Sequence, residues 1–297
     1  TPALLTFSGS GVTMPGDLIA KANVGTLTGH ALSTIKYLNR FWNLTNIGVA
    51  FASGSASVAF DYLAADLSGG AVANMLKVAK FDAPSTWTYP ATNAIAYTVT
   101  ASGMSSFSDF AAAECETPTI TVDDTPTICQ GSTSANLVYT ATTGGADQYT
   151  IDFDAAANMA GFLDVVYTNL PVSPIAVAVP MGAAPGTYDA TINVKNSVTG
   201  CEGMPMPITV MINTAATAEA GGPYATCGTT PVTITAISNN LGTWSGGMGD
   251  FDDETEKITT YTPDASEIGT TVILTWTSDD PDDMDPCPAV SDVASVV

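Results

Sequence analysis

Short segments in which apolar and polar residues alternate recur along this chain, and they constrain its fold more than any other feature. Such segments, each bounded by Gly, Pro or Asn, include "NLVYTAT", "QYTIDFD", "PIAVAVP", "TYDATINVK", "PITVMIN", "PVTITAIS" and "TTVILTWTS". A period of two places successive side chains on opposite faces of a strand, and the bounding residues favour turns. Short strands at this spacing are typical of β-sandwiches. The sequence therefore predicts an all-β fold.

Two stretches that mix turn-forming and small residues interrupt the alternation, "ECETPTITVDDTP" at 114–126 and "NTAATAEAGGPYA" at 213–225. They divide the chain into three predicted units, 1–115, 116–213 and 214–297. A chain of 297 residues is long enough for each unit to bury a core of its own. We therefore expect three tandem β-sandwich domains, including a buried strand at 37–45 with Phe41 and Trp42 on opposite faces.

The negative charge of the chain is concentrated in the second and third units. Residues 1–113 hold five basic and five acidic residues, residues 114–213 hold ten acids against one lysine, and residues 214–297 hold fourteen acids against one lysine. This field repels phosphate backbones and anionic lipids, so nucleic acid is excluded as a partner, and no apolar run is long enough for membrane insertion. Cations and neutral glycans stay possible partners.

The cysteines repeat in position between the second and third units. Cys129 precedes the first strong strand of its unit and Cys201 lies in the turn between the last two strands, while Cys227 and Cys287 occupy the same two places in the next unit. Sequence alone leaves many pairings open. The repetition favours one disulfide per domain, Cys129 with Cys201 and Cys227 with Cys287, and hence an oxidising, extracellular setting.

Cys115 is left over by this pairing. It is interpreted either as a free thiol in a domain linker, which we favour because Glu114 and Glu116 disfavour the thiolate, or as half of an intermolecular disulfide.

An acidic loop, "SDDPDDMDPCPAV" at 278–290, precedes the last predicted strand. Its carboxylates are candidate calcium ligands, although the loop lacks the calcium-loop pattern and its prolines restrict convergence: Asp279, Asp280, Asp282, Asp283 and Asp285. The alternative is a solvated turn whose like charges keep a hairpin from pairing edge to edge.

The sequence contains no catalytic signature, and we expect a protein that is not an enzyme. His30 is the only histidine, which makes a Ser-His-Asp triad or a two-histidine metal site hard to build. The glycine-rich "GTWSGGMGD" lacks the basic residue of a phosphate loop. Core packing explains at least two of the four tryptophans better than sugar stacking does. No cofactor other than possible calcium is implied.

Several stretches resemble the repeats of surface proteins of gliding bacteria. "YLNRFWNLTN" with "VAFDYLAADL" and "SGMSSFSDFAAA" resembles a β-sandwich module of proteins exported by type IX secretion, and "TICQGSTSANLVY" through "APGTYDATINVKNSVTGCEG" resembles the PKD-like, immunoglobulin-like repeats of their adhesins. The resemblance implies immunoglobulin-like or PKD-like sandwiches at a bacterial cell surface. It also implies a Lys/Arg-rich sorting domain, which we expect to have been cleaved or to lie outside this sequence.

These features lead to two functional hypotheses. The first is an extracellular structural protein, a subunit or segment of a surface fibre, sheath or adhesin. We expect it to form a head-to-tail homopolymer, in which the apolar "TPALLTF" or the terminal "SDVASVV" is added as a strand to a neighbour. The second is a carbohydrate-binding module, which clustered and exposed Trp87 and Tyr89 would favour and their burial would disfavour.

Overall fold

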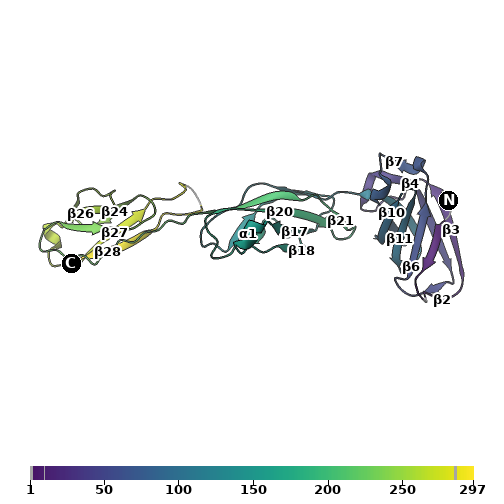
Figure 1. Cartoon of the computed structure of the whole chain (residues 1–297), viewed down its shortest axis with the longest axis horizontal. Helices are drawn as coiled ribbons and strands as arrows, with labels where there is room; N and C mark the ends of the chain where they lie inside the picture. Colours follow the sequence, from purple (N-terminus) through teal and green to yellow (C-terminus); the bar gives the residue numbers. More distant parts are fainter. Residues whose placement is uncertain (1–2, 10, 284–285) are drawn as a thin grey trace.

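Three β-sandwiches lie in a row in the computed structural model, which describes residues 3–9, 11–283 and 286–297 (Figure 1). Each sandwich surrounds its own hydrophobic core. The predicted all-β fold is confirmed. Among the described residues, the single α-helix covers only α1 (Ala155–Met159), and no helix is long and apolar enough to cross a membrane.

The N-terminal sandwich packs two antiparallel sheets face to face. Trp42 stacks on Phe60 at 4.6 Å between ring centroids and Phe110 packs against the same ring, so the core is built from aromatics. One sheet has the order β1 (Ala3–Phe7), β6 (Ala56–Asp61), β11 (Thr98–Met104), β10 (Ala91–Ile95), and the other β3 (Asp17–Val24), β4 (Leu32–Ile47), β12 (Asp109–Cys115), β8 (Leu76–Asp82), β9 (Thr86–Thr88), with β7 (Leu67–Ser68) beside β4 and a separate pair β2 (Val12–Met14) and β5 (Ala50–Phe51).

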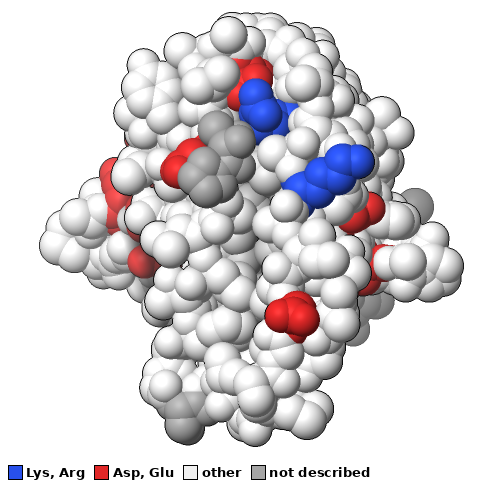
Figure 2. All heavy atoms as spheres, turned by 90° about the vertical axis from the view of Figure 1, so that its right-hand side faces the viewer, with Lys and Arg blue, Asp and Glu red and all other residues white. Residues whose placement is uncertain are grey.

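The predicted strand at 37–45 lies within β4, with Trp42 buried and Phe41 on the opposite, half-buried face. Figure 2 looks at this end of the molecule, where charged side chains of both signs are scattered over a largely uncharged surface. This agrees with the balanced charge of residues 1–113.

The middle sandwich follows the predicted alternation closely. Ile151, Ile192 and Val210 point inward from neighbouring strands and are almost completely buried. Its main sheet has the order β14 (Thr127–Cys129), β22 (Met206–Asn213), β20 (Gly186–Asn196), β17 (Gln148–Phe153), β18 (Val165–Asn169), with β21 (Cys201–Glu202) beside β20, and it is covered by the pairs β13 (Thr119–Val122) with β16 (Tyr139–Thr143) and β15 (Ser134–Leu137) with β19 (Ile175–Ala178).

The C-terminal sandwich has the smallest of the three main cores. Trp244 and Trp276 meet edge to face at 5.5 Å between centroids, and Tyr261 is fully buried beside them. Its sheets have the orders β23 (Val232–Thr235), β26 (Ile258–Thr262), β25 (Asp250–Phe251) and β24 (Gly242–Gly246), β27 (Val272–Ser278), β28 (Ser291–Val296). The acidic loop joins β27 to β28, as the sequence predicts.

The predicted disulfides are wrong. Cys115 is bonded to Cys201 and Cys129 to Cys287, with Cα–Cα distances of 5.6 and 5.0 Å, and the free, exposed cysteine is Cys227. Cys115 is therefore neither a free thiol nor half of an intermolecular bond.

Strand geometry explains why Cys129 and Cys201 do not pair. Cys129 stands opposite Asn213, beside the start of β20, whereas Cys201 stands opposite Asn196 at the end of β20. The eleven residues of this strand, at about 3.3 Å each, separate the two ends by roughly 35 Å, and a disulfide needs Cα atoms about 4.4–6.8 Å apart.

Cys227 and Cys287 are separated in the same way. Thr226, next to Cys227, donates its backbone N–H to Val297 O beyond the end of β28, while Cys287 lies in the loop that precedes β28. The middle and the C-terminal sandwich therefore each carry their two repeated cysteines at opposite ends.

Candidate functional site

The first junction joins the end of the N-terminal sandwich to the last hairpin of the middle sandwich. Cys115 ends β12, and its partner Cys201 lies at the tip of the hairpin between β20 and β22. Cys201 is buried in a small apolar cluster with Leu32, Ala79 and Ala113 of the N-terminal sandwich. Side chains from both sandwiches therefore exclude water at this junction.

A lysine adds a polar contact at the same junction. Lys77 Nζ of β8 donates to Thr199 O at 3.3 Å and Gly200 O at 3.1 Å, in the hairpin of the middle sandwich. Burial, and then the charge of Lys195, lower the pKa of Lys77 below its ordinary value, whereas the carboxylate of Glu202 raises it. The Lys77 ammonium thus satisfies carbonyls at the hairpin tip.

The second junction joins the middle sandwich to the acidic loop of the C-terminal sandwich. It lies at the outgoing end of the middle sandwich, by which we mean the end from which the chain continues into the next sandwich. Cys129, at the end of β14, is bonded to Cys287. Asn213 Nδ2, at the end of β22, donates to Asp282 Oδ2 at 2.7 Å. The acidic loop is therefore attached to the preceding sandwich and not, as the sequence suggested, to the start of its own.

Two of the candidate calcium ligands, Asp280 and Asp282, accept hydrogen bonds with their carboxylates. Asp280 Oδ1 accepts the backbone N–H of Asp282 at 3.1 Å, and the backbone N–H of Asp279 bonds to Leu241 O. Asp283 has a positive φ of 59°, and Asp285 lies outside the described residues. Within residues 3–9, 11–283 and 286–297, no group of three or more His, Cys, Asp or Glu side chains is placed to hold a metal ion. Calcium binding here stays a prediction.

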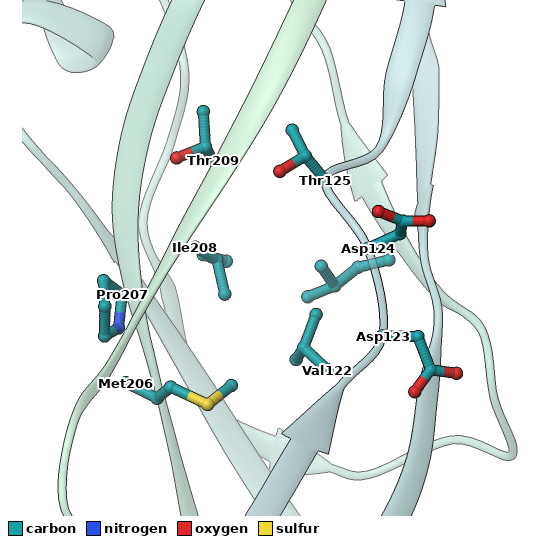
Figure 3. A pocket seen from close by; sticks show the side chains of 9 residues that line it. Val122, Asp123, Asp124, Thr125, Met206, Pro207, Ile208 and Thr209 are labelled. Atoms are coloured by element: carbon teal, nitrogen blue, oxygen red, sulfur yellow. The ribbon is translucent and has the colours of Figure 1, made fainter.

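A hollow of about 410 Å³ opens in the middle sandwich between β22 and the segment that joins β13 to β14. Figure 3 shows Val122, Met206 and Ile208 facing this space, while the carboxylates of Asp123 and Asp124 turn away from it. Asp123 Oδ1 accepts a hydrogen bond from Thr140 Oγ1. The hollow is thus lined by both apolar and polar groups, and these two acids do not converge on a common point within it.

The aromatics proposed for glycan binding are engaged in packing. Trp87 contacts the rings of His30 and Phe81 at centroid distances of 5.4 and 5.0 Å, and the Tyr89 hydroxyl accepts the backbone N–H of Ala31 at 2.7 Å. Both aromatics are only half exposed, and His30 is buried. The other three tryptophans, Trp42, Trp244 and Trp276, are core residues, as expected for at least two of the four.

Comparisons with protein-family models and with curated proteins found no match. Among solved structures, the chain is similar to protocadherin gamma B2 extracellular cadherin domains 3–6 (8% identity, 95% of this chain and 76% of that chain, TM-score 0.34). It is also similar to the sidekick-1 immunoglobulin domains 1–5 (8%, 99% and 74%, 0.33) and to the adhesin domain of Epf from Streptococcus pyogenes (9%, 71% and 98%, 0.26).

Proposed function

We propose that this chain is a stiff extracellular segment of a surface fibre, sheath or adhesin, built from three sandwich domains divided at residues 115 and 213. The observation that carries the proposal is that both disulfides join neighbouring sandwiches. A bond within a sandwich stabilises that sandwich alone, whereas a bond between two sandwiches fixes their relative orientation.

Two covalent connections at a junction restrict motion in a way that one cannot. Sandwiches joined by the peptide chain alone can rotate about the linker, since domains of one chain ordinarily move relative to each other unless their interface is large and hydrophobic. The Cys115–Cys201 and Cys129–Cys287 bonds add a second attachment point at each junction. Such bonds persist in oxidising compartments, which supports an extracellular location. The bacterial origin and the type IX secretion rest on the sequence resemblance.

The terminal strands favour assembly from whole sandwiches over exchange of strands. The segment expected to be donated, β1, pairs with β6, and its Leu5 and Phe7 pack on the N-terminal core. β28 likewise pairs with β27 along its whole length. Donation of either strand out of its own sandwich into a neighbour's would have to break these contacts first.

Small-angle X-ray scattering tests the proposed stiffness. We expect the oxidised chain to scatter as an elongated particle of fixed shape. The variant with Cys115, Cys129, Cys201 and Cys287 all replaced by serine should show a shorter mean end-to-end length and a flexible profile. Cys227→Ser is the matched control, because it removes a thiol that bridges nothing, and it should scatter like the parent. Identical curves for the parent and the four-serine variant would refute the proposal.

A further inference from the structure

The backbone around the free Cys227 reproduces the backbone around the bonded Cys129. In the middle sandwich, the segment leading to Cys129 runs parallel to the end of β22, and Met211 N donates to Pro126 O. In the C-terminal sandwich, the segment leading to Cys227 runs parallel to the end of β28, and Val297 N donates to Tyr224 O. Both cysteines therefore stand at the outgoing end of a sandwich, beside its last strand.

The outgoing cysteine is bonded to the next sandwich at both junctions of this chain. Cys115 reaches Cys201 in the last hairpin of the middle sandwich, and Cys129 reaches Cys287 in the last loop of the C-terminal sandwich. Cys227 is the third outgoing cysteine and is free and exposed. The chain thus contains two examples of the bond that Cys227 is placed to make.

Exposed apolar side chains lie at the same tip as Cys227. Met248 is 77% exposed, and Ile268 and Val297 are each 56% exposed. They are brought to this end by the hydrogen bond from Met248 N to Glu267 Oε1, next to Ile268, and by the bond from Thr226 N to Val297 O. Apolar side chains also surround the bridge at the first junction, so this tip has the chemistry of an interface.

We propose that the outgoing tip of the C-terminal sandwich binds a further sandwich domain that carries a cysteine in its last hairpin loop, and that this cysteine forms a disulfide with Cys227. The two thiols lose two protons and two electrons to a disulfide oxidant, which leaves as two thiols. A second copy of this chain docked head to tail does not fit, because residues 1–114 contain no cysteine. The inference rests on the proposed function, since it extends the same row of sandwiches.

Two fusions to the full chain test the proposal. One adds a second copy of residues 214–297, which brings its own Cys287 and carries Cys227→Ser within the copy. The other adds a second copy of residues 116–213, which brings its own Cys201 and carries Cys129→Ser within the copy, so that Cys227 of the parent part is the one outgoing thiol in each fusion. Tyr224 stands opposite Val296, so Cys227 falls opposite a position two residues beyond Val297, whereas Cys129 falls opposite Asn213. A two-residue spacer before the added copy therefore reproduces the register of the second junction.

Non-reducing peptide mapping by mass spectrometry gives the readout. We expect a peptide that joins Cys227 to the loop cysteine of the added copy, while the Cys115–Cys201 and Cys129–Cys287 bridges stay intact. Replacing only the added loop cysteine by serine should leave Cys227 free for alkylation. A free Cys227 in both fusions, or dimers joined through two Cys227 residues in place of the expected bridge, would overturn the proposal.

The unfused chain supplies a second measurement that does not depend on folding of a graft. Cys227 should react with a thiol reagent in the native chain at about the rate of an unfolded control, with one thiol titrated per chain, and Cys227→Ser should abolish the reaction. A Cys227 that is protected in the native chain would overturn the proposal independently. Because scattering tests the stiffness of the existing junctions and thiol mapping tests the free tip, the two proposals fail separately.

Discussion

The two junctions share a disulfide and differ in almost everything else. At the first, an apolar cluster and Lys77 support the Cys115–Cys201 bond. At the second, a hydrogen bond between Asn213 and Asp282 lies beside the Cys129–Cys287 bond. The non-covalent contacts therefore vary with the surfaces that meet, while the covalent link recurs. This comparison indicates that the disulfide is the element that defines a junction and that the other contacts adjust its stiffness.

The largest effect on stiffness and stability is expected when the disulfide of the second junction is removed. Cys129→Ser with Cys287→Ser opens a bridge that spans 158 residues, which the loop-entropy treatment values at about 5 kcal/mol. Among the described residues, no buried apolar cluster like that of the first junction surrounds this bond, so we expect free bending in scattering and a lower unfolding temperature of the C-terminal sandwich by calorimetry. A Cys227→Ser background prevents disulfide exchange. A rod as stiff as the parent would show that the second junction does not depend on its bond.

The equivalent change at the first junction is expected to be milder. Cys115→Ser with Cys201→Ser opens a bridge spanning 86 residues, worth about 4.6 kcal/mol in the same treatment. Because Leu32, Ala79 and Lys77 still contact the hairpin, the junction should bend less than the second one does. Scattering of the two variants side by side measures the difference. Equal bending would mean that the apolar cluster adds no stiffness.

Removal of Lys77 should reduce this difference in bending between the two junctions. Lys77→Met keeps the apolar stem but deletes the donor to Thr199 O and Gly200 O, whose bonds contribute on the order of 1 kcal/mol each. We expect little change with the disulfide intact and increased bending when Cys115 and Cys201 are also serine. Lys21→Met, which removes a lysine of the same sandwich outside this junction, is the matched control.

At the second junction, Asp282→Ala should have a smaller effect. It deletes the acceptor of the Asn213 side chain and should lower the unfolding free energy by about 1 kcal/mol. Asp279→Ala removes the same charge from the same loop and serves as the control, since the contact of Asp279 with Leu241 uses its backbone N–H. Equal losses in urea titrations of the two variants would assign the effect to charge alone.

The smallest expected effect is that of calcium on the acidic loop. If the loop binds calcium, calcium should raise the unfolding temperature of the C-terminal sandwich by more than sodium of matched ionic strength does. Asp282→Asn with Asp283→Asn should remove the excess. An equal response to sodium would mean that the loop is a charged turn at the junction and does not bind calcium specifically.

Strand alternation predicted the fold well because it reports a local property. The segments around Ile151, Ile192 and Val210 alternate in sequence and face the core as expected. The terminal segments expected to be strands are β1 and β28, and the buried strand with Trp42 is part of β4.

The disulfide pairing could not be predicted from repetition of the cysteines alone. Cys129 and Cys227 occupy equivalent places in their units, and so do Cys201 and Cys287. This repetition is the same whether each disulfide closes within a unit or reaches the next unit, so it does not distinguish the two pairings. A signal was nevertheless present, because an outgoing end and a last hairpin loop must lie a full strand apart in any such sandwich. The roles of Lys77 and Asn213 had no signal in the sequence, because their partners lie far along the chain in another unit. The partners of Lys77 are 122 and 123 residues away, and the partner of Asn213 is 69 residues away.

The Cys129–Cys287 bond also sets how the chain responds to tension. When the chain is pulled from outside residues 115–287, the shortest covalent path runs from Cys115 to Cys129, crosses the sulfur atoms and continues from Cys287. The segment between these two cysteines, a contour of roughly 500 Å if extended, carries no load. The part of each of the middle and C-terminal sandwiches that lies between these cysteines would then be shielded, whereas β13, β14 and β28 lie on the loaded path. The N-terminal sandwich has no such bypass, so it would unfold and lengthen as a whole under force.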